Sequence, residues 1–302
     1  MVKIGINSGA ASGPETTFPG LIERAKKVES LGFDCFWMAH MMGLDAMTAL
    51  AVVGQQTEKI QLGTAVVPSY PRHPMVMAQQ AATTNAAASG RFHLGIGLSH
   101  KPIIEGMFGI SYEKPARHMR EYLNVLAPAL RNEKVSYRGE QISANAQLAI
   151  SESTSVPLLV AALGEVMLKL AGAHADGTIT WMTGPKTLEE HIIPKIRKAA
   201  AEAGRPEPRI VAGVPTAIVS DQDAAIARID KGMKMYGQLD SYRAMLAREG
   251  VSGPSGIANI GNEADLRRYI QRLRDIGVTD LNCAILGVGD HDTTLEFLAS
   301  EL

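Results

Sequence analysis

Residues 62–74 read LGTAVVPSYPRHP, an apolar strand that stops at a cluster of prolines. The strand half, Ile60 to Val67, is apolar enough to be buried on both faces, as strands of parallel sheets are. Prolines lack an N–H and fix φ, so the chain must leave the sheet abruptly after this strand. Pro74 then suits the first turn of a helix that continues from Met75 to Ala88. A rigid exit from a parallel strand is a place where α/β proteins build their sites.

Strand-like runs and helical periodicity alternate along the rest of the chain. Eight such strand–helix units in 302 residues predict an α/β fold, a (β/α)8 TIM barrel. The predicted strands are Val2 to Asn7, Asp34 to Ala39, Ile60 to Val67, Phe92 to Leu98, Leu158 to Ala162, Thr178 to Met182, Ile210 to Val219 and Leu281 to Leu286. The predicted helices are Gly20 to Leu31, Ala46 to Gln56, Met75 to Ala88, Glu165 to His174, Leu188 to Ala203, Ala264 to Ile276 and Thr293 to Ser300.

Two segments are longer than ordinary connections. His100 to Val156 contains a predicted helix, Arg117 to Arg131, and a polar turn around Tyr137-Arg138-Gly139-Glu140. Asp221 to Asn259 has room for about two more helices. We therefore expect one domain over residues 1–302, with insertions at about 100–156 and 221–259, after strands four and seven. Both follow strands, so both are expected to project over the C-terminal mouth of the barrel as walls or lids.

The alternative fold is an open doubly wound sheet, which carries a glycine fingerprint between a strand and a helix. The nearest match, Gly95-Ile96-Gly97-Leu98-Ser99-His100, lacks the third glycine and lies inside a strand. Glycines inside a strand more often let another group approach the backbone closely, and in a barrel that group can be a flat ring. This pattern favours the barrel.

Composition narrows the class of partners. A net charge of −1 without a basic stripe predicts no nucleic-acid partner, and no apolar run approaches the roughly 20 residues of a membrane span. Cys35 and Cys283 lie in apolar runs, where a free cysteine is more often a buried hydrophobe than a disulfide partner or nucleophile. With no h-region before the first strand, we expect a cytoplasmic protein. Neither H-E-x-x-H nor H-x-H on the first strand occurs, so no metal site is predicted.

Several short motifs, in this order along nearly the whole chain, resemble the bacterial luciferase-like superfamily. The chain is most similar there to the deazaflavin (F420)-dependent oxidoreductases of actinobacteria and methanogens. The motifs are Gly63-Thr64-Ala65-Val66 with Arg72-His73-Pro74, Gly90-Arg91-Phe92 leading into Gly95-Ile96-Gly97, and Pro157 to Ala162 leading into Ala171-Gly172 and Asp176-Gly177.

The resemblance implies a barrel with an insertion after strand four, usually a homodimer, that binds coenzyme F420 or FMN at the C-terminal mouth. It also implies a non-proline cis peptide bond at the end of strand three, which here would be Ala65-Val66, facing the cofactor ring. Cofactor contacts are implied at His40, at Thr64, Ala65 and Val66, at Gly97, Leu98 and Ser99, and at Ala162, Leu163, Gly164, Glu165 and Val166.

Two histidines are the catalytic candidates. His40 follows strand two at the position where similar glucose-6-phosphate enzymes keep a histidine beside the reactive carbon of the deazaflavin. A histidine there can take or give a proton near neutral pH, or it can merely hydrogen-bond the cofactor. Those relatives carry a glutamate where this chain has His100, so a sugar-phosphate substrate is not expected. His93, His118 and His174 lie in apolar or helical stretches and are interpreted as structural.

The turn from Ala162 to Val166 is the expected seat of the cofactor phosphate, because free N–H groups at a helix start attract an anion. Every strand-to-helix turn offers such amides, so a purely structural role remains an alternative. Glu165 would repel the anion, which leaves the backbone to bind it. Arg72 and His73 either reach the ring or its polyglutamate tail, or are solvated rim charges.

The sequence therefore predicts a cytoplasmic F420-dependent oxidoreductase that moves hydride between deazaflavin C5 and a small, apolar organic substrate. Apolar residues near the expected mouth, among them Trp37, Met41 and Trp181, suit such a substrate or simply pack the core. Two alternatives remain within the superfamily. One is an FMN-dependent monooxygenase supplied with reduced flavin by a partner reductase, and the other is a non-catalytic flavin-binding paralogue.

Overall fold

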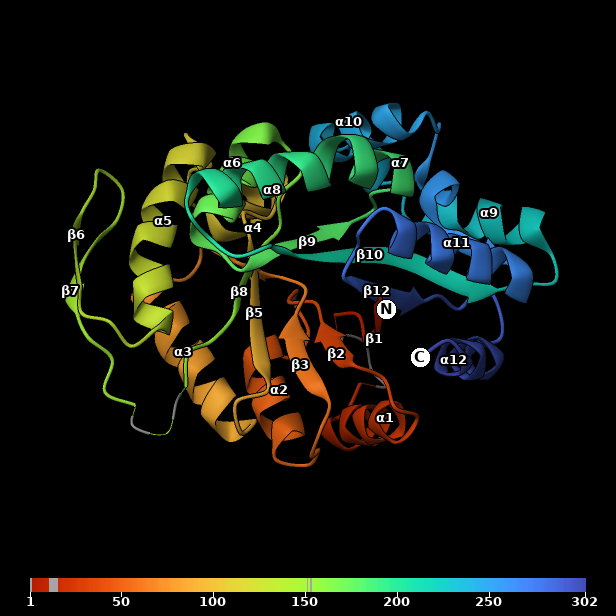
Figure 1. Cartoon of the computed structure of the whole chain (residues 1–302), viewed down its shortest axis with the longest axis horizontal. Coiled ribbons are helices and arrows are strands. Elements are labelled where there is room, and N and C mark those ends of the chain that lie inside the picture. Colours follow the sequence, from red (N-terminus) through yellow and green to blue (C-terminus); the bar gives the residue numbers. More distant parts are fainter. Residues whose placement is uncertain (1, 11–15, 151, 153) are drawn as a thin grey trace.

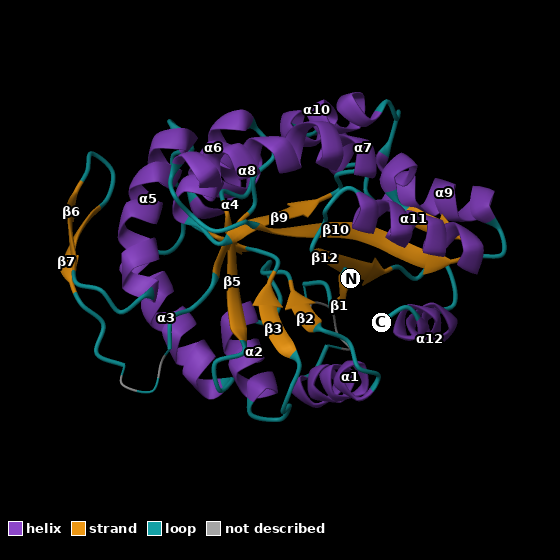
Figure 2. Cartoon of the chain, in the orientation of Figure 1, coloured by secondary structure: helices purple, strands orange, loops and turns teal. Residues whose placement is uncertain are grey.

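The computed structural model describes residues 2–10, 16–150, 152 and 154–302. Eight parallel strand positions close into a barrel that helices surround (Figures 1 and 2), which confirms the predicted (β/α)8 fold. The barrel strands are β1 (Lys3–Asn7), β2 (Cys35–Met38), β3 (Gln61–Thr64), β5 (Phe92–Gly97), β8 (Leu158–Val160), β9 (Gly177–Trp181), β10 (Arg209–Ile218) and β12 (Asp280–Ile285). Pairing of β10 with both β9 and β12 completes the circle.

The outer ring consists of one helix or helical segment after each barrel strand. Glu165–His174 has the predicted bounds, and most other ring helices differ from prediction by one to three residues at their ends. The ring helices are α1 (Phe18–Ser30), α2 (Ala46–Gly54), α3 (Pro74–Ala87), α5 (Pro115–Leu130), α6 (Glu165–His174), α7 and α8 (Pro185–Thr187 and Ile193–Glu202), α11 (Glu263–Asp275) and α12 (His291–Ser300). Among these described helices none is both long and apolar enough to cross a bilayer.

Three predicted elements are broken or reassigned. The predicted strand Ile60 to Val67 is two pieces, β3 and β4 (Val67–Pro68), because the backbone leaves the β3 ladder at Ala65 and rejoins the sheet beside β5. The predicted helix Leu188 to Ala203 begins as a π-helical turn, Leu188–Ile192, between α7 and α8.

The third reassigned element is the predicted helix Arg117 to Arg131, which was expected to cover the mouth. It is α5, and it packs between α3 and α6 as the fourth ring helix. Its apolar side chains explain this, because they are buried on the barrel rather than over an opening.

The rest of that segment lies outside the ring. It supplies α4 (Lys101–Phe108), which was not predicted, and an antiparallel hairpin of β6 (Val135–Arg138) and β7 (Ser143–Ala146). The hairpin lies at the outer edge of the molecule, beside α5 (Figure 1), so this part does not cover the mouth as expected. Buried Glu121 of α5 holds it in place by accepting three backbone N–H groups, from Glu140, Gln141 and Ile142, at 2.8–3.1 Å.

The segment between β10 and α11 contains the expected two helices, α9 (Gln222–Gly232) and α10 (Asp240–Glu249), joined by a 3-10 turn, Tyr236–Gln238. A second 3-10 turn, Pro254–Ile257, leads to a short strand that was not predicted, β11 (Asn259–Gly261). That strand adds to β10 in parallel, outside the closed barrel.

Side chains fill the interior of the barrel. Trp37 is fully buried, and a Cβ added at Gly63 or at Gly5 would lie 2.3 or 2.8 Å from its ring atoms. The two glycines on the neighbouring strands therefore make room for one indole. The Arg209 guanidinium lies 5.6 Å from the centre of the Trp37 ring. Below the indole, Arg209 forms a two-point ion pair with Asp280, at 2.5 and 2.9 Å, so a charged pair closes the N-terminal end.

Candidate active site

The C-terminal ends of the strands form a half-exposed floor of mostly small side chains. Side chains alternate along a strand, so the inward direction of Trp37 and Gly5 fixes which residues face inward at the strand ends. These positions are half-buried, whereas the inward cluster one layer below is buried. Alanines predominate, so most of the inward side chains at the strand ends are short. The inward strand-end residues are Asn7, Ala39, Ala65, Ala161, Trp181 and Ala284.

The peptide bond Ala65-Val66 is cis, as predicted, and lies at this floor. Below it, the buried Thr64 hydroxyl donates to the Gly95 carbonyl and accepts from the Gly95 N–H, both at 2.9 Å. A Cβ at Gly97 would lie 2.9 Å from Val66 Cγ2. The glycines of β5 therefore make room for the β3–β4 connection in this structure. The sequence suggests a flat ring at this place instead.

His40 lies at the edge of the floor, with both ring nitrogens engaged. The Ala46 N–H donates to Nδ1 at 3.3 Å, and the Arg72 guanidinium lies 3.4 and 3.5 Å from Nε2. Asp45 pairs with Arg72 at 2.6 Å. The Arg72 side chain is thus held in an ion pair and is 20% exposed. Burial lowers the pKa of His40, Arg72 lowers it further, and Asp45 opposes them.

His100 lies in a separate, aromatic environment. Its ring centre is 5.7 Å from that of Tyr242 in α10, and Tyr242 meets Tyr236 edge-on at 5.1 Å. Tyr236 in turn lies 6.3 Å from Trp181 of the floor. The helical segment after β10 thereby reaches the mouth, as expected for a wall. Burial lowers the pKa of His100, and no contact joins it to His40 among the described interactions.

The β5 exit that carries the next predicted contacts turns sharply. Ser99 has φ 59°, in the left-handed region, and its carbonyl accepts from the Tyr112 hydroxyl at 3.1 Å. Leu98 before it is half-buried and packs on the main core. Met182, after β9, has φ 53°, so two strand exits at the mouth share this less common backbone conformation.

The turn before α6 has the open backbone expected of an anion seat. Gly164, its N-cap, has no side-chain cap, and a Cβ there would meet nothing within 4 Å. Glu165 is drawn away into an ion pair with Lys195. His191, in the π-helical turn, donates from Nε2 to the Leu163 carbonyl at 2.8 Å. Ala162 is fully buried and Val166 is 50% exposed, so backbone groups are what this turn can offer a ligand.

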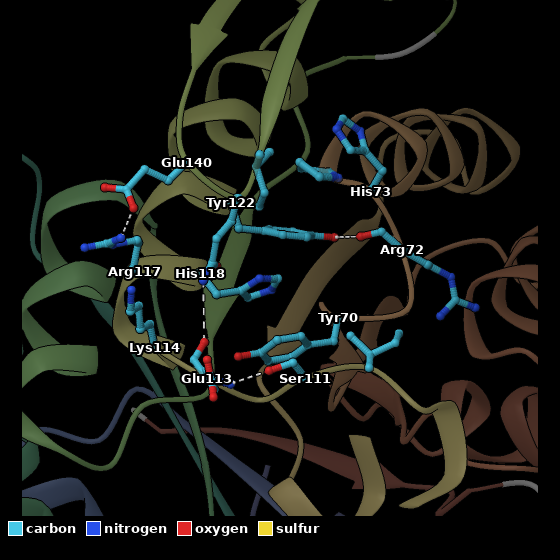
Figure 3. A pocket seen from close by; sticks show the side chains of 14 residues that line it. Tyr70, Arg72, His73, Ser111, Glu113, Lys114, Arg117, His118, Tyr122 and Glu140 are labelled. Carbon is cyan, nitrogen blue, oxygen red and sulfur yellow. Dashed lines mark hydrogen bonds and ion pairs between the residues drawn. The ribbon is translucent and has the colours of Figure 1, made fainter. Parts of the chain in front are cut away.

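A concave region, not predicted from sequence, lies between α5, the β6–β7 hairpin and the chain after β4 (Figure 3). It has a volume of about 600 Å³. His118 lines it, stacked on Tyr70 with ring centres 3.8 Å apart, and bonds the Ser69 hydroxyl at 3.1 Å. Arg72 turns its guanidinium away from this pocket (Figure 3), while its carbonyl accepts from the Tyr122 hydroxyl at 3.0 Å.

The remaining titratable candidates behave as structural groups. His93 lies beside Arg209 in the closed end of the barrel, where burial first and then that guanidinium lower its pKa to about 3. Cys35 and Cys283 are free and buried, as interpreted from sequence. Within the part of the chain that the structure describes, no group of three or more His, Cys, Asp or Glu is placed to hold a metal ion.

The succession of motifs and the barrel both have counterparts in known proteins. The sequence matches the luciferase-like monooxygenase family over residues 1–299. The chain belongs to that family. Two luciferase-like relatives are 5,10-methylenetetrahydromethanopterin reductases. The one from Methanolobus tindarius is 30% identical over 242 residues, 78% of this chain and 72% of the relative. The one from Methanopyrus kandleri is 30% identical over 287 residues, 88% of this chain and 77% of the relative.

Solved luciferase-like structures share the fold over the whole chain. The coenzyme F420-dependent tetrahydromethanopterin reductase from Methanopyrus kandleri superposes with a TM-score of 0.83 at 23% identity, covering 100% of this chain and 98% of that one. An F420-dependent secondary alcohol dehydrogenase, in complex with an F420–acetone adduct, superposes with a TM-score of 0.81 at 19% identity, with the same coverage. At these identities the likeness establishes the fold.

Proposed function

We propose that this protein is an F420-dependent oxidoreductase that transfers a hydride between deazaflavin C5 and a small, apolar organic substrate. The observation that carries the proposal is the alanine-rich floor around Ala65 and Val66, with His40 at its edge. A barrel mouth is where TIM-barrel enzymes act, and the inward side chains of this floor are uncharged. The methanopterin reductase relatives, 30% identical, and the coenzyme F420-dependent reductase structure from Methanopyrus kandleri support the choice of F420.

The residues present fit a deazaflavin in two respects. The small side chains at the strand ends leave room for a planar ring to lie across the barrel, and the uncapped N–H groups at Gly164 offer a seat for a phosphate. F420 supplies a carbon that accepts or donates hydride. The chain's own contribution is to hold that ring, exclude water with the Trp181, Tyr236 and Tyr242 wall, and place His40 where a proton is exchanged.

His40 is the proposed proton partner and His100 the second candidate. His40 lies beside the floor, with a neutral ring that can accept a proton. Met41 and Met42 follow it, 49% and 62% exposed, and provide apolar contacts for substrate. His100 faces the tyrosine wall instead, which suits a contact with substrate more than with the ring.

Binding measurements with F420 and FMN test the proposal. Purified protein is titrated with each cofactor, and quenching of cofactor fluorescence gives the two dissociation constants. Micromolar or tighter binding of F420, with FMN at least tenfold weaker, is the expected result. Tight FMN binding without F420 binding would replace the proposal by an FMN-dependent monooxygenase. Binding of F420 without hydride transfer to any tested carbonyl or imine, or from any tested alcohol, would favour a non-catalytic paralogue.

We further propose a single-domain homodimer that works in the cytoplasm. Val52 on α2 and Val76 on α3 are 38% and 53% exposed on neighbouring helices, an apolar pair suited to burial between two copies. The unpaired Cys35 and Cys283 suit a reducing compartment. Light scattering at micromolar concentration should give twice the 32.3 kDa chain mass, and a monomer mass would reject the dimer.

A further inference from the structure

His40 has a hydrogen-bond donor at each ring nitrogen and a carboxylate oxygen, Asp45 Oδ2, 3.6 Å from Nδ1. The Ala46 backbone N–H points at Nδ1, 3.3 Å away, and Arg72 Nη2 and Nη1 lie 3.4 and 3.5 Å from Nε2. Neither a backbone amide nor a guanidinium can accept a hydrogen bond, and arginine stays protonated in proteins. A neutral imidazole can accept from one of these donors. An imidazolium could accept from neither, so protonation would set N–H against N–H at Nε2, whereas at Nδ1 the proton could be drawn toward Asp45 Oδ2, 3.6 Å away.

The guanidinium is fixed independently of His40. Asp45 Oδ2 pairs with Arg72 Nη2 at 2.6 Å, while Asp45 Oδ1 accepts from the Thr48 N–H and from Gln80 Nε2, both at 2.9 Å. Both oxygens of the Asp45 carboxylate therefore accept hydrogen bonds, and residues of α2 and α3 hold the carboxylate in place. A fixed carboxylate in turn fixes the direction of the guanidinium.

The backbone of Arg72 is held from the opposite side. The Tyr122 hydroxyl of α5 donates to the Arg72 carbonyl at 3.0 Å, and the Arg72 N–H donates to Ser69 at 3.3 Å. His118 of α5 bonds the Ser69 hydroxyl at 3.1 Å. The turn after β4 is thus pinned to a ring helix, and the side chain of Arg72 crosses from that turn to the mouth.

We propose that Arg72 and Asp45 are positioning residues that hold His40 at the mouth as a neutral hydrogen-bond acceptor. The inference deepens the proposed function, on which the consequence for catalysis rests. A neutral ring has a lone pair that can take up a proton and has no imidazolium proton to give, and uptake at Nε2 requires the contact with Arg72 to be given up. Among the described residues, the charged groups that act on His40 are Arg72, after β4, and Asp45, at the start of α2.

The two charges make opposite predictions, which separates an electrostatic role from a merely structural one. Removing the guanidinium relieves a like-charge repulsion and should raise the pKa of His40 by roughly one unit, a tenfold gain in proton affinity. Asp45→Asn removes the negative charge and keeps the shape of the side chain, so it should lower the pKa of His40. If a variant only loosened the structure, the His40 ring would become exposed, and its pKa would move toward that of a free histidine in both variants.

The test is a ¹⁵N-histidine NMR titration of the protein without cofactor, with His40→Gln to assign the signal. Arg72→Met is expected to titrate at higher pH than the wild type, Asp45→Asn at lower pH, and Arg72→Lys close to the wild type because the charge is retained. Arg138→Met, on the exposed β6–β7 hairpin, is the matched control and should leave the His40 signal unchanged. An unchanged or lowered pKa in Arg72→Met would overturn the proposal.

A second readout links the pair to turnover without depending on how well the variants fold. Circular dichroism gives the folded fraction, and activity is then measured as a function of pH at saturating F420. The acidic limb of the profile should move in the same direction as the NMR pKa in each variant, with the Kd for F420 within about threefold of the wild type. A limb that stays in place while the NMR pKa moves would show that His40 is not the proton partner. In that case the positioning of the ring would stand and the proposed role of His40 would fail.

Discussion

The side chain of Val66 occupies the space beside Gly97 that any larger residue would need. A Cβ at Gly97 would lie 2.9 Å from Val66 Cγ2 and 3.2 Å from the Cβ of Ala161, closer than side chains normally approach. The chain after β3, the end of β5 and the chain after β8 therefore pack together at the position where Gly97 has no side chain. The position of the floor under the proposed ring depends on this contact, since Val66 cannot move inward past Gly97.

Gly97→Ala should consequently destabilise the protein by about 1–3 kcal/mol, the usual effect of overpacking, and weaken F420 binding. Urea unfolding and fluorescence titration measure the two effects. Gly106→Ala is the control, because a Cβ at Gly106 on α4 would meet nothing within 4 Å. A Gly97→Ala variant that is as stable as the wild type and binds F420 equally well would contradict this account of the floor.

His40→Ala should lower saturated turnover by about 10²- to 10⁴-fold, the span expected for a general acid or base, while F420 affinity stays within about tenfold. If His40 only contacts the cofactor, affinity should fall by the ~1 kcal/mol of one lost hydrogen bond and turnover should persist. Stopped-flow absorbance of F420 separates the two results.

His100→Ala, measured in parallel, should raise KM for substrate more than it lowers kcat, because His100 packs on Tyr242 of the wall. The physical reason is that a lost wall contact weakens substrate binding in the ground state and the transition state alike. A loss confined to kcat would instead make His100 the proton partner and remove that role from His40.

Breaking the Arg209–Asp280 pair in the closed end of the barrel should destabilise the protein strongly. Asp280 is 4% exposed at its side chain, so Arg209→Met leaves a buried charge without its partner and should cost about 3–5 kcal/mol in chemical denaturation. The double variant Arg209→Met with Asp280→Asn should be more stable than Arg209→Met alone. Additive effects in this double-mutant cycle would show that the two charges do not depend on each other.

Glu121 should make stability depend on pH in the acid range. Burial raises its pKa, but the backbone N–H groups of Gln141, Ile142 and Glu140 outweigh burial, and the net pKa lies below the usual 4.5. Because the folded pKa is depressed, this stabilisation is full above about pH 4.5 and is lost as the pH falls through the folded pKa.

Glu121→Gln should therefore reduce the acid dependence of unfolding and increase hydrogen exchange in the β6–β7 hairpin at neutral pH. Hydrogen-exchange mass spectrometry locates the effect. Glu133→Gln, an exposed carboxylate beside Arg131, is the matched control. Equal exchange in both variants would argue against Glu121 as the anchor of the hairpin.

The barrel strands and most of the surrounding helices could be predicted from the sequence, because each has a regular local spacing of apolar residues. Glu165–His174 has the predicted bounds, since its start follows a glycine, Gly164, which is its N-cap. The helix Arg117 to Arg131 was assigned to a lid although its periodicity was recognised. Its place in the ring is a tertiary property, decided by which apolar faces remain uncovered, and sequence spacing does not report that.

The candidate site was predicted less completely. His40, the Ala65-Val66 bond and the turn at Gly164 lie at the mouth as expected, because each follows directly from a strand end. Arg72 was left open between two exposed roles. Its partner Asp45 is 27 residues away and reads in the sequence only as a helix cap, so the ion pair was invisible without the fold.

The charged pair that closes the lower end of the barrel has a kinetic consequence. Trp37 and Arg209 fill the interior of the described barrel, so ligands are expected to reach the floor from the C-terminal mouth. A cofactor ring lying on that floor blocks the route beneath anything bound above it. Under the proposed function, F420 must arrive first and depart last, whereas the organic reactant comes and goes above it. Turnover would then follow a compulsory order, and the organic product would inhibit without competing with free cofactor for the empty enzyme.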